Sequence, residues 1–258
     1  MINYEVALGQ FELFVLILIR LASFVFAAPF FNTANVPNRF KIGFSFALSI
    51  IVYSINSDMT VQYNNMMDFC IIVVQEVIVG VLLGAVSSFA VQIIQFSGKM
   101  IDMDIGISMA QIYDPTTRMQ VCIMGNIYYY MLKLLLIISG MHRFLIDAIV
   151  ETYNFIPIGG VKFGAGLYTT IIQFMSDYFV IGFRIALPVF ATMLLLNCIL
   201  AILARIAPQM NMFVVGMQLK IFVGIFVIFF TIRMLPAVSN FIFEEIKDLF
   251  SLLVRGMS

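Results

Sequence analysis

Long apolar tracts separated by short polar segments form the main pattern of this chain. The tracts predict helices over residues 11–31, 42–55, 69–96, 121–140, 165–203 and 212–232, followed by an amphipathic helix over 237–254. A helix needs about 20 residues to cross a hydrocarbon core roughly 30 Å thick. Because the first internal tract is shorter than this and two others are much longer, six simple spans do not fit one bilayer. The pattern predicts an all-α integral membrane protein of long, kinked helical hairpins.

Two of these tracts leave their structure open. Tract 165–203 contains Pro188, which bends or breaks a helix, so the tract is either one kinked helix or a hairpin. The last segment has one apolar stripe, which consists of Ile242, Ile246, Leu249 and Leu253. Such a stripe predicts a helix that lies on a membrane surface or packs against a partner.

Composition supports the membrane class. Hydrophobic residues make up 62% of the sequence, charged residues 11%, and the mean hydropathy is +1.06. Average soluble domains contain about 25% charged residues. The 14 basic and 14 acidic residues cancel, so no net field favours nucleic acid or an acidic partner. We expect membrane lipid around a single helical domain, residues 1–258, with no separable soluble domain.

Residues 98–120 form a polar segment between two apolar tracts. The segment combines three aspartates with four methionines and several isoleucines. Irregular backbone near membrane depth is tolerated only where protein buries it or water surrounds it, because unpaired amides in hydrocarbon are costly. We therefore expect the segment to line or block a passage. The alternative is a membrane-edge loop tucked against neighbouring helices.

Several charged residues lie inside the apolar tracts, namely Arg20, Glu76, Lys133, Asp177, Arg184 and Lys220. Each would cost at least a few kcal/mol if it faced lipid. We expect them to face protein or water and to pair with one another or with a partner chain. Proton or ion relays are the alternative. Glu76 also shares a helix face with Gly80 and Gly84, which predicts a surface where another helix approaches closely.

Motifs for catalysis or metal binding are sparse. The sequence has no His-Glu-x-x-His zinc motif, no phosphate-binding loop of the Walker type and no Cys-x-x-Cys pair. An intramembrane serine protease would need Ser and His together, and Ser108 with His142 is the nearest candidate. A carboxylate dyad of Asp102 and Asp104 is also disfavoured, because residues two apart on a helix point away from each other. We expect no enzyme activity, no cofactor and no metal.

A second polar break, residues 203–220, predicts a tight turn between two apolar helices. Arg205 and Pro208 suit the turn, and Asn211 is placed to cap the second helix. The order of Arg205, Pro208, Asn211 and Phe213, followed by Gly216 and Lys220, closely resembles the FliR family of flagellar type III export-gate proteins.

Three further blocks resemble the same family in the same order. They are Arg20 with Pro29, Pro37 and Arg39; Glu76 with Gly80 and Gly84; and Gly98 with Asp102, Gly106, Asp114 and Pro115. Two positions depart from the family pattern. Met217-Gln218 replaces a common Phe-Pro, which removes an expected kink, and Asp104 replaces a Gln, which adds negative charge to the central segment.

The resemblance implies a non-enzymatic subunit of an export channel for unfolded flagellar proteins. One copy is expected to assemble with several copies each of FliP and FliQ into a helical export-gate cone, near FlhB and FlhA. The expected location is the flagellar basal body in the bacterial cytoplasmic (inner) membrane, with part of the gate projecting to the periplasmic side. Such a cone, lying largely outside the bilayer, would also explain the uneven tract lengths.

The resemblance further implies that the segment matching residues 106–116 is a plug in the closed pore. Its expected residues are Gly106, Ile107, Ser108, Met109, Ala110, Gln111, Ile112, Asp114 and Pro115. Gly98, Asp102 and Arg118 are expected to serve as hinge or anchors. Helix packing and assembly are assigned to Arg20, Glu76, Gly80, Gly84, Arg184, Arg205, Pro208, Asn211 and Lys220. Flexible Met side chains beside Ile can repack around a gap, which suits a seal.

Three alternatives remain open at this point. The corresponding subunit of a virulence-type secretion system has similar motifs, and neighbouring genes would separate the two. A secondary solute transporter would also contain buried charges and broken helices, but it should show an internal hydropathy repeat, and none is convincing. An intramembrane hydrolase would require Ser108 or His142.

Overall fold

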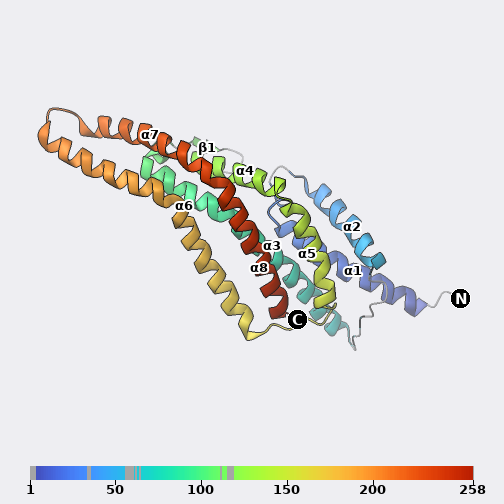
Figure 1. Cartoon of the computed structure of the whole chain (residues 1–258). Helices are drawn as coiled ribbons and strands as arrows, with labels where there is room; N and C mark the ends of the chain where they lie inside the picture. The colour runs from blue at the N-terminus through green and yellow to red at the C-terminus, as the bar shows by residue number, and fades with distance from the viewer. Residues whose placement is uncertain are drawn as a thin grey trace. The chain divides into compact units, whose positions relative to one another are not determined.

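A computed structural model describes residues 4–33, 36–55, 61, 63, 65–110, 112–114 and 119–257 of the chain (Figure 1). Eight α-helices fill most of this described part: α1 (Tyr4–Ala27), α2 (Asn38–Ile55), α3 (Met66–Ile105), α4 (Ile123–Ile138), α5 (Met141–Phe155), α6 (Ala165–Ile206), α7 (Met212–Thr231) and α8 (Leu235–Met257). Two 3₁₀ helices, η1 (Ile107–Ala110) and η2 (Ile232–Met234), join them, with two short strands. The all-α prediction is confirmed.

Four helices of the described part are long and apolar enough to cross a membrane, judged by length and composition. They cover residues 9–27, 66–105, 166–206 and 212–257, the last of which includes both α7 and α8. At about 1.5 Å per residue, the 40 residues of α3 make a helix about twice as long as a hydrocarbon core is thick. The expectation that tract lengths would not match a set of simple spans is thus confirmed.

Helix α6 settles the choice that Pro188 leaves open in the sequence. The helix continues for 42 residues through Pro188, so the tract is one long helix and not a hairpin. The hydroxyl of Thr192 donates to the carbonyl oxygens of Pro188 at 3.0 Å and Val189 at 2.8 Å. The Thr192 hydroxyl thus adds a side-chain donor to two backbone carbonyls in the turn after the proline.

Helix α3 corrects the predicted limits of the central polar segment. Residues 98–105 are helical and belong to α3, whereas the pattern predicted irregular backbone from Gly98 onward. The irregular backbone begins at Gly106, whose φ of +88° is a left-handed conformation that ends a helix readily only with glycine. Beyond it, β1 (Ile112–Asp114) pairs antiparallel with β2 (Met119–Val121), with Tyr113 opposite Gln120.

Helix α5 was not predicted. Gly140, with φ +82°, separates it from α4. Arg143, Asp147 and Glu151 make this helix amphipathic, so it does not stand out as an apolar tract. Helix α5 buries Met141, Leu145, Ile149 and Tyr153 along one face.

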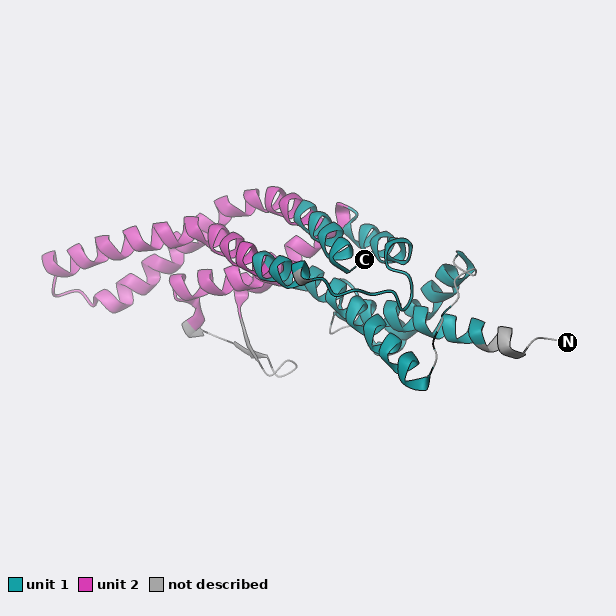
Figure 2. Ribbon diagram, turned by 90° about the horizontal axis from the view of Figure 1, so that it is seen from below, with its two compact units in different colours: residues 1–89, 140–174, 244–258 teal, residues 90–139, 175–243 magenta. Residues whose placement is uncertain are grey.

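The chain divides into two compact units, coloured separately in Figure 2. Unit 1 contains residues 1–89, 140–174 and 244–258, and unit 2 contains residues 90–139 and 175–243. The expectation that residues 1–258 act as one helical domain stays a prediction.

The core of unit 1 lies on α1 and its neighbours. Leu16, Ile17 and Leu21 of α1 are fully buried. The ring of Phe24 meets that of Phe250 edge to face at 6.5 Å, and Phe250 meets Phe144 at 6.0 Å. The apolar stripe of α8 is almost completely buried, so the prediction that it faces a membrane surface or a partner is wrong: other parts of the same chain cover it.

Candidate functional site

The strongest polar interaction of unit 1 is a fully buried ion pair between α1 and α3. Arg20 Nε and Nη2 donate to the two carboxylate oxygens of Glu76, the second bond measuring 3.0 Å, and both side chains are 0% exposed. A bidentate guanidinium–carboxylate pair is the geometry that best offsets the desolvation of two charges. The expectation that buried charges pair with one another is confirmed for these two residues.

Further groups complete this ion pair. Arg20 Nη1 donates to the carbonyl oxygen of Ile156 at 3.1 Å and to Thr152 Oγ1 at 3.5 Å. The backbone N–H of Gly159 donates to Glu76 Oε1 at 3.2 Å. The guanidinium also lies 4.4 Å from the ring centre of Tyr153. Helix α5 and the loop after it therefore supply further partners to both members of the pair.

Tyr153 is itself held in place at the end of this cluster. Its hydroxyl donates to the carbonyl oxygen of Ile17 at 3.2 Å, and burial raises the pKa of its phenol above the ordinary value near 10. The phenol therefore stays neutral and keeps donating at any physiological pH.

Gly80 and Gly84 bring α3 into backbone contact with α1. A Cβ at Gly80 would overlap Ser23 and the carbonyl of Arg20, and a Cβ at Gly84 would lie 2.6 Å from the Cβ of Ala27. The close helix approach predicted for this face is confirmed. It places Glu76 one turn from the contact and opposite Arg20, so the glycines set the geometry of the ion pair.

Unit 2 contains the central polar segment, residues 98–120. Asp102 makes the contacts that hold this segment to the helices on either side. The carbonyl oxygen of Asp102 accepts from the backbone N–H of Gly106, where the irregular backbone begins, at 3.1 Å. Its carboxylate accepts from the N–H of Met124, in the first turn of α4, at 3.2 Å to each oxygen. The first N–H groups of a helix lack intrahelical partners and attract negative charge. The side chain of Asp102 thus connects the last turn of α3 to the first turn of α4, between which residues 106–122 lie.

A close crossing of α3 and α4 lies beside this residue. A Cβ at Gly98 would overlap the backbone of Gly125, so the two helices touch at their glycines. Gly98 therefore acts here as a packing residue inside a helix. On the same helix, Ser97 Oγ donates to the carbonyl oxygen of Gly182 in α6 at 2.8 Å.

The last turn of α3 is held against α7. Ile105 is 0% exposed, and a Cβ at Gly224 would lie 2.7 Å from its side chain. The charge of Lys220 lies close enough to attract Asp104, whose Oδ2 is buried and accepts no hydrogen bond from the described part of the chain. Asp104 and Lys220 thus join the end of α3 and α7 by charge attraction.

The predicted plug residues are described only in part. Gly106, Ile107 and Ser108 are half-buried. Only the backbone is described for Met109, Ala110, Ile112 and Asp114, and Gln111, Pro115 and Arg118 lie outside the described residues.

The second polar break has the predicted form. Residues 207–211 make a turn between α6 and α7, and Asn211 Oδ1 accepts from the N–H of Phe213 at 3.2 Å, which confirms the predicted cap. Arg205 and Pro208 are exposed at this turn, and Arg184 is exposed in the middle of α6.

Four residues at these contacts were missed in the sequence. Thr152, Gly159, Gly125 and Gly224 each matter because of a partner far away in the chain, and none belongs to a local pattern. Among the described residues, no group of three or more His, Cys, Asp or Glu side chains could hold a metal ion. The contacts found hold helices against one another and hold residues 106–122 between α3 and α4.

Comparison with known proteins covers nearly the whole chain. The chain is 31% identical to the flagellar biosynthetic protein FliR of Bacillus subtilis over 251 residues, which is 96% of this chain and 93% of that protein. It is 27% identical to the FliR of Escherichia coli (100% and 97%) and 24% identical to that of Aquifex aeolicus (92% of each). Residues 11–246 match the family described as bacterial export proteins, family 1. The resemblance to FliR proteins is confirmed, and the chain belongs to this family of bacterial export proteins.

Proposed function

We propose that this chain is a non-enzymatic subunit of a flagellar protein export gate in the cytoplasmic membrane. It assembles with several copies of FliP and FliQ into a channel for unfolded flagellar proteins, close to FlhB and FlhA, with part of the gate on the periplasmic side. The observation that carries the proposal is the match to relatives named flagellar biosynthetic protein over at least nine tenths of this chain. The same names favour the flagellar system over a virulence-type system.

Exposed apolar side chains support a partner-rich setting. Helices α6 and α7 expose large hydrophobic residues that include Phe179, Phe183, Phe190, Leu195, Ile199, Phe222, Phe226 and Phe229. Such faces need cover from lipid or from other subunits, because contiguous apolar patches of this extent are rare on isolated soluble proteins. Helical partners such as FliP and FliQ would supply that cover.

Within this gate, residues 106–116 act as a plug, with Ile105, Ile107, Met109 and Ile112 sealing against water and ions. The double role of Asp102 supports this assignment, since a segment attached at both ends to one residue can move without separating α3 from α4. Asp114 and Arg118 are proposed as further anchors, and Gly106 as the hinge.

The remaining family residues serve assembly in this proposal. Arg20, Glu76, Gly80 and Gly84 fix the α1–α3 contact, and Arg205, Pro208 and Asn211 shape the α6–α7 turn. Lys220 would hold the end of α3 through Asp104.

The test is ion conductance of membranes that contain the complete complex. Deletion of residues 106–116 should raise the leak while FliP and FliQ still co-purify in wild-type ratio. Asp102→Ala should raise it less, because loss of a cap worth about 1 kcal/mol increases a released population roughly fivefold.

Thr192→Ala is the matched control, because it also removes side-chain to backbone hydrogen bonds from unit 2 but lies in α6. Its leak should equal that of the wild type. Unchanged conductance after the deletion would rule out the plug. Purification of a lone chain, free of other small hydrophobic proteins, would instead argue for a solute transporter.

A further inference from the structure

Arg184 is an exposed cation in the middle of an apolar helix. It makes no hydrogen bond or ion pair that the structure shows with the described part of the chain, and the nearest acid on α6, Asp177, lies two turns away. A guanidinium facing hydrocarbon without a partner would cost several kcal/mol. We therefore expect the Arg184 guanidinium to pair with a group outside this chain.

The position of Arg184 along α6 is informative. Residues 185–204 carry no charge, and Arg205 follows them. A helix crosses a hydrocarbon core with about 20 residues, and arginines at the ends of such a stretch reach toward the headgroups. Helix α7 follows α6 after the turn at 207–211. A further exposed arginine, Arg233, lies directly after the last turn of α7.

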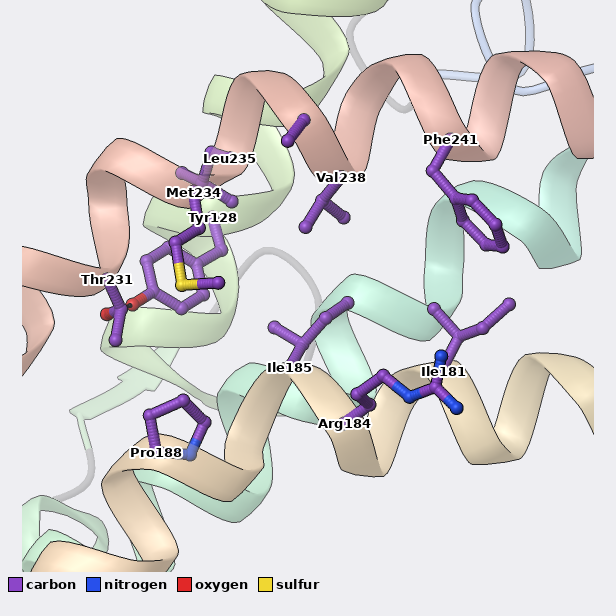
Figure 3. A pocket seen from close by; sticks show the side chains of 11 residues that line it. Tyr128, Ile181, Arg184, Ile185, Pro188, Thr231, Met234, Leu235, Val238 and Phe241 are labelled. Carbon is purple, nitrogen blue, oxygen red and sulfur yellow. Dashed lines mark hydrogen bonds between the residues drawn. The ribbon is translucent and has the colours of Figure 1, made fainter.

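A pocket of about 270 Å³ opens beside Arg184, between α6 and the start of α8 (Figure 3). Its walls are largely apolar, with Ile185 and Pro188 on α6 facing Met234, Val238 and Phe241 on the other side. Figure 3 shows Arg184 and Phe241 toward one end and Pro188 with Tyr128 and Thr231 toward the other. The pocket is therefore an apolar slot with a positive charge at one end.

The two hydroxyls in this slot need no polar ligand. Tyr128 and Thr231 are hydrogen bonded to each other at 2.9 Å, and Thr231 Oγ1 also donates to the carbonyl oxygen of Ile228 at 3.0 Å. Among the polar side chains that line the slot, only Arg184 lacks a partner in the described part of the chain.

We propose that this slot binds one anionic phospholipid, whose phosphate pairs with Arg184 and whose acyl chain lies against Ile185, Pro188 and Val238. A guanidinium matches a phosphate with two parallel hydrogen bonds. Basic pockets between membrane helices are known to bind anionic headgroups. A phosphate fits better than a partner's carboxylate, because Arg184 lies at the end of a stretch of bilayer-core length and beside a slot lined for a chain of methylenes. The lipid site refines the assembly role proposed for Arg184, and it does not depend on the plug.

The test is native mass spectrometry of the complex purified from its own membranes in mild detergent, followed by titration with phosphatidylglycerol or phosphatidylcholine of equal chain length. The wild type should retain phosphatidylglycerol in preference to phosphatidylcholine. Arg184→Gln should weaken phosphatidylglycerol binding by about tenfold or more, because a charge-assisted bond is lost, and should leave phosphatidylcholine unchanged. Arg184→Lys should retain part of the preference. Ala237→Leu, which fills the slot, should weaken both lipids.

Asp177→Asn is the control on the same helix, since it removes another exposed charge without touching the slot, and it should bind both lipids as the wild type does. Equal binding of the two lipids by the wild type would overturn the proposal. Loss of a protein subunit from Arg184→Gln, with lipid binding unchanged, would overturn it in favour of a partner carboxylate. Recovery of the complex with FliP and FliQ but no specific lipid would defeat the lipid site alone.

Discussion

The two units treat their charges in opposite ways. In unit 1, Arg20 and Glu76 are fully buried, and each remaining donor or acceptor has a partner within the same chain. In unit 2, Arg184 is exposed in an apolar helix, and Asp104 keeps a buried oxygen without a hydrogen bond in the described part.

This difference contrasts an ion pair that is satisfied within the chain with charges that are not. A paired, hydrogen-bonded ion pair needs nothing from outside, and its loss should affect folding of the chain itself. A charge such as Arg184, which has no partner in the described part of the chain, would need one from its surroundings. We therefore expect substitutions in unit 1 to act on stability and substitutions in unit 2 to act mainly on closure and binding.

The largest expected effect is that of Glu76→Leu. It leaves the Arg20 guanidinium buried without a counter-charge, which should destabilise the chain by about 3–5 kcal/mol. The measurement is the yield and thermal unfolding temperature of the detergent-purified complex, and little intact complex should be recovered. Adding Arg20→Leu to Glu76→Leu should restore part of the stability, because no unpaired charge remains. Asp147→Leu, which removes an exposed acid of α5, is the control.

A smaller effect is expected from Gly98→Ala in unit 2. The new Cβ would overlap Gly125 and push α4 away from α3, at a cost of about 1–3 kcal/mol. Because the crossing lies beside Asp102, the variant should also raise ion leak. The same change at Gly43, where a Cβ meets open space, should stabilise its helix slightly. Identical unfolding temperatures for the two variants would contradict the close crossing.

The smallest effect is expected from Tyr153→Phe. The change removes the hydrogen bond to the carbonyl of Ile17 but keeps the ring under Arg20, so it should cost about 1 kcal/mol. A wild-type leak with a modest fall in unfolding temperature would place Tyr153 with the stability residues of unit 1. A raised ion leak would contradict the expectation that substitutions in unit 1 act on stability alone.

The sequence reveals those contacts whose partners repeat along one helix or follow one turn. Glu76, Gly80 and Gly84 share a face by their spacing alone, and Asn211 precedes its helix as a cap should. A charge such as Arg20 is expected to find a partner because facing lipid is costly, but the sequence does not say that the partner is Glu76.

Contacts that depend on distant backbone could not be predicted in this way. Gly98 looks like a break in an apolar tract until Gly125 is found against it, and only then is α3 seen to continue through it. The carbonyl of Ile156 and the N–H of Gly159 complete the ion pair, yet backbone groups leave no mark on a sequence. The plug assignment rests on the family resemblance and on the anchors, since most of its side chains lie outside the described residues.

The attachment of residues 106–123 to Asp102 has a consequence for the length of that segment. Its ends are already held together, so extra residues would add only the entropy of a larger closed loop. That cost grows slowly, by about 0.6 kcal/mol for each doubling of length. We therefore expect the segment to accept an inserted epitope or fluorophore tag while α3 and α4 keep their contacts, and such a tag would report on the proposed plug.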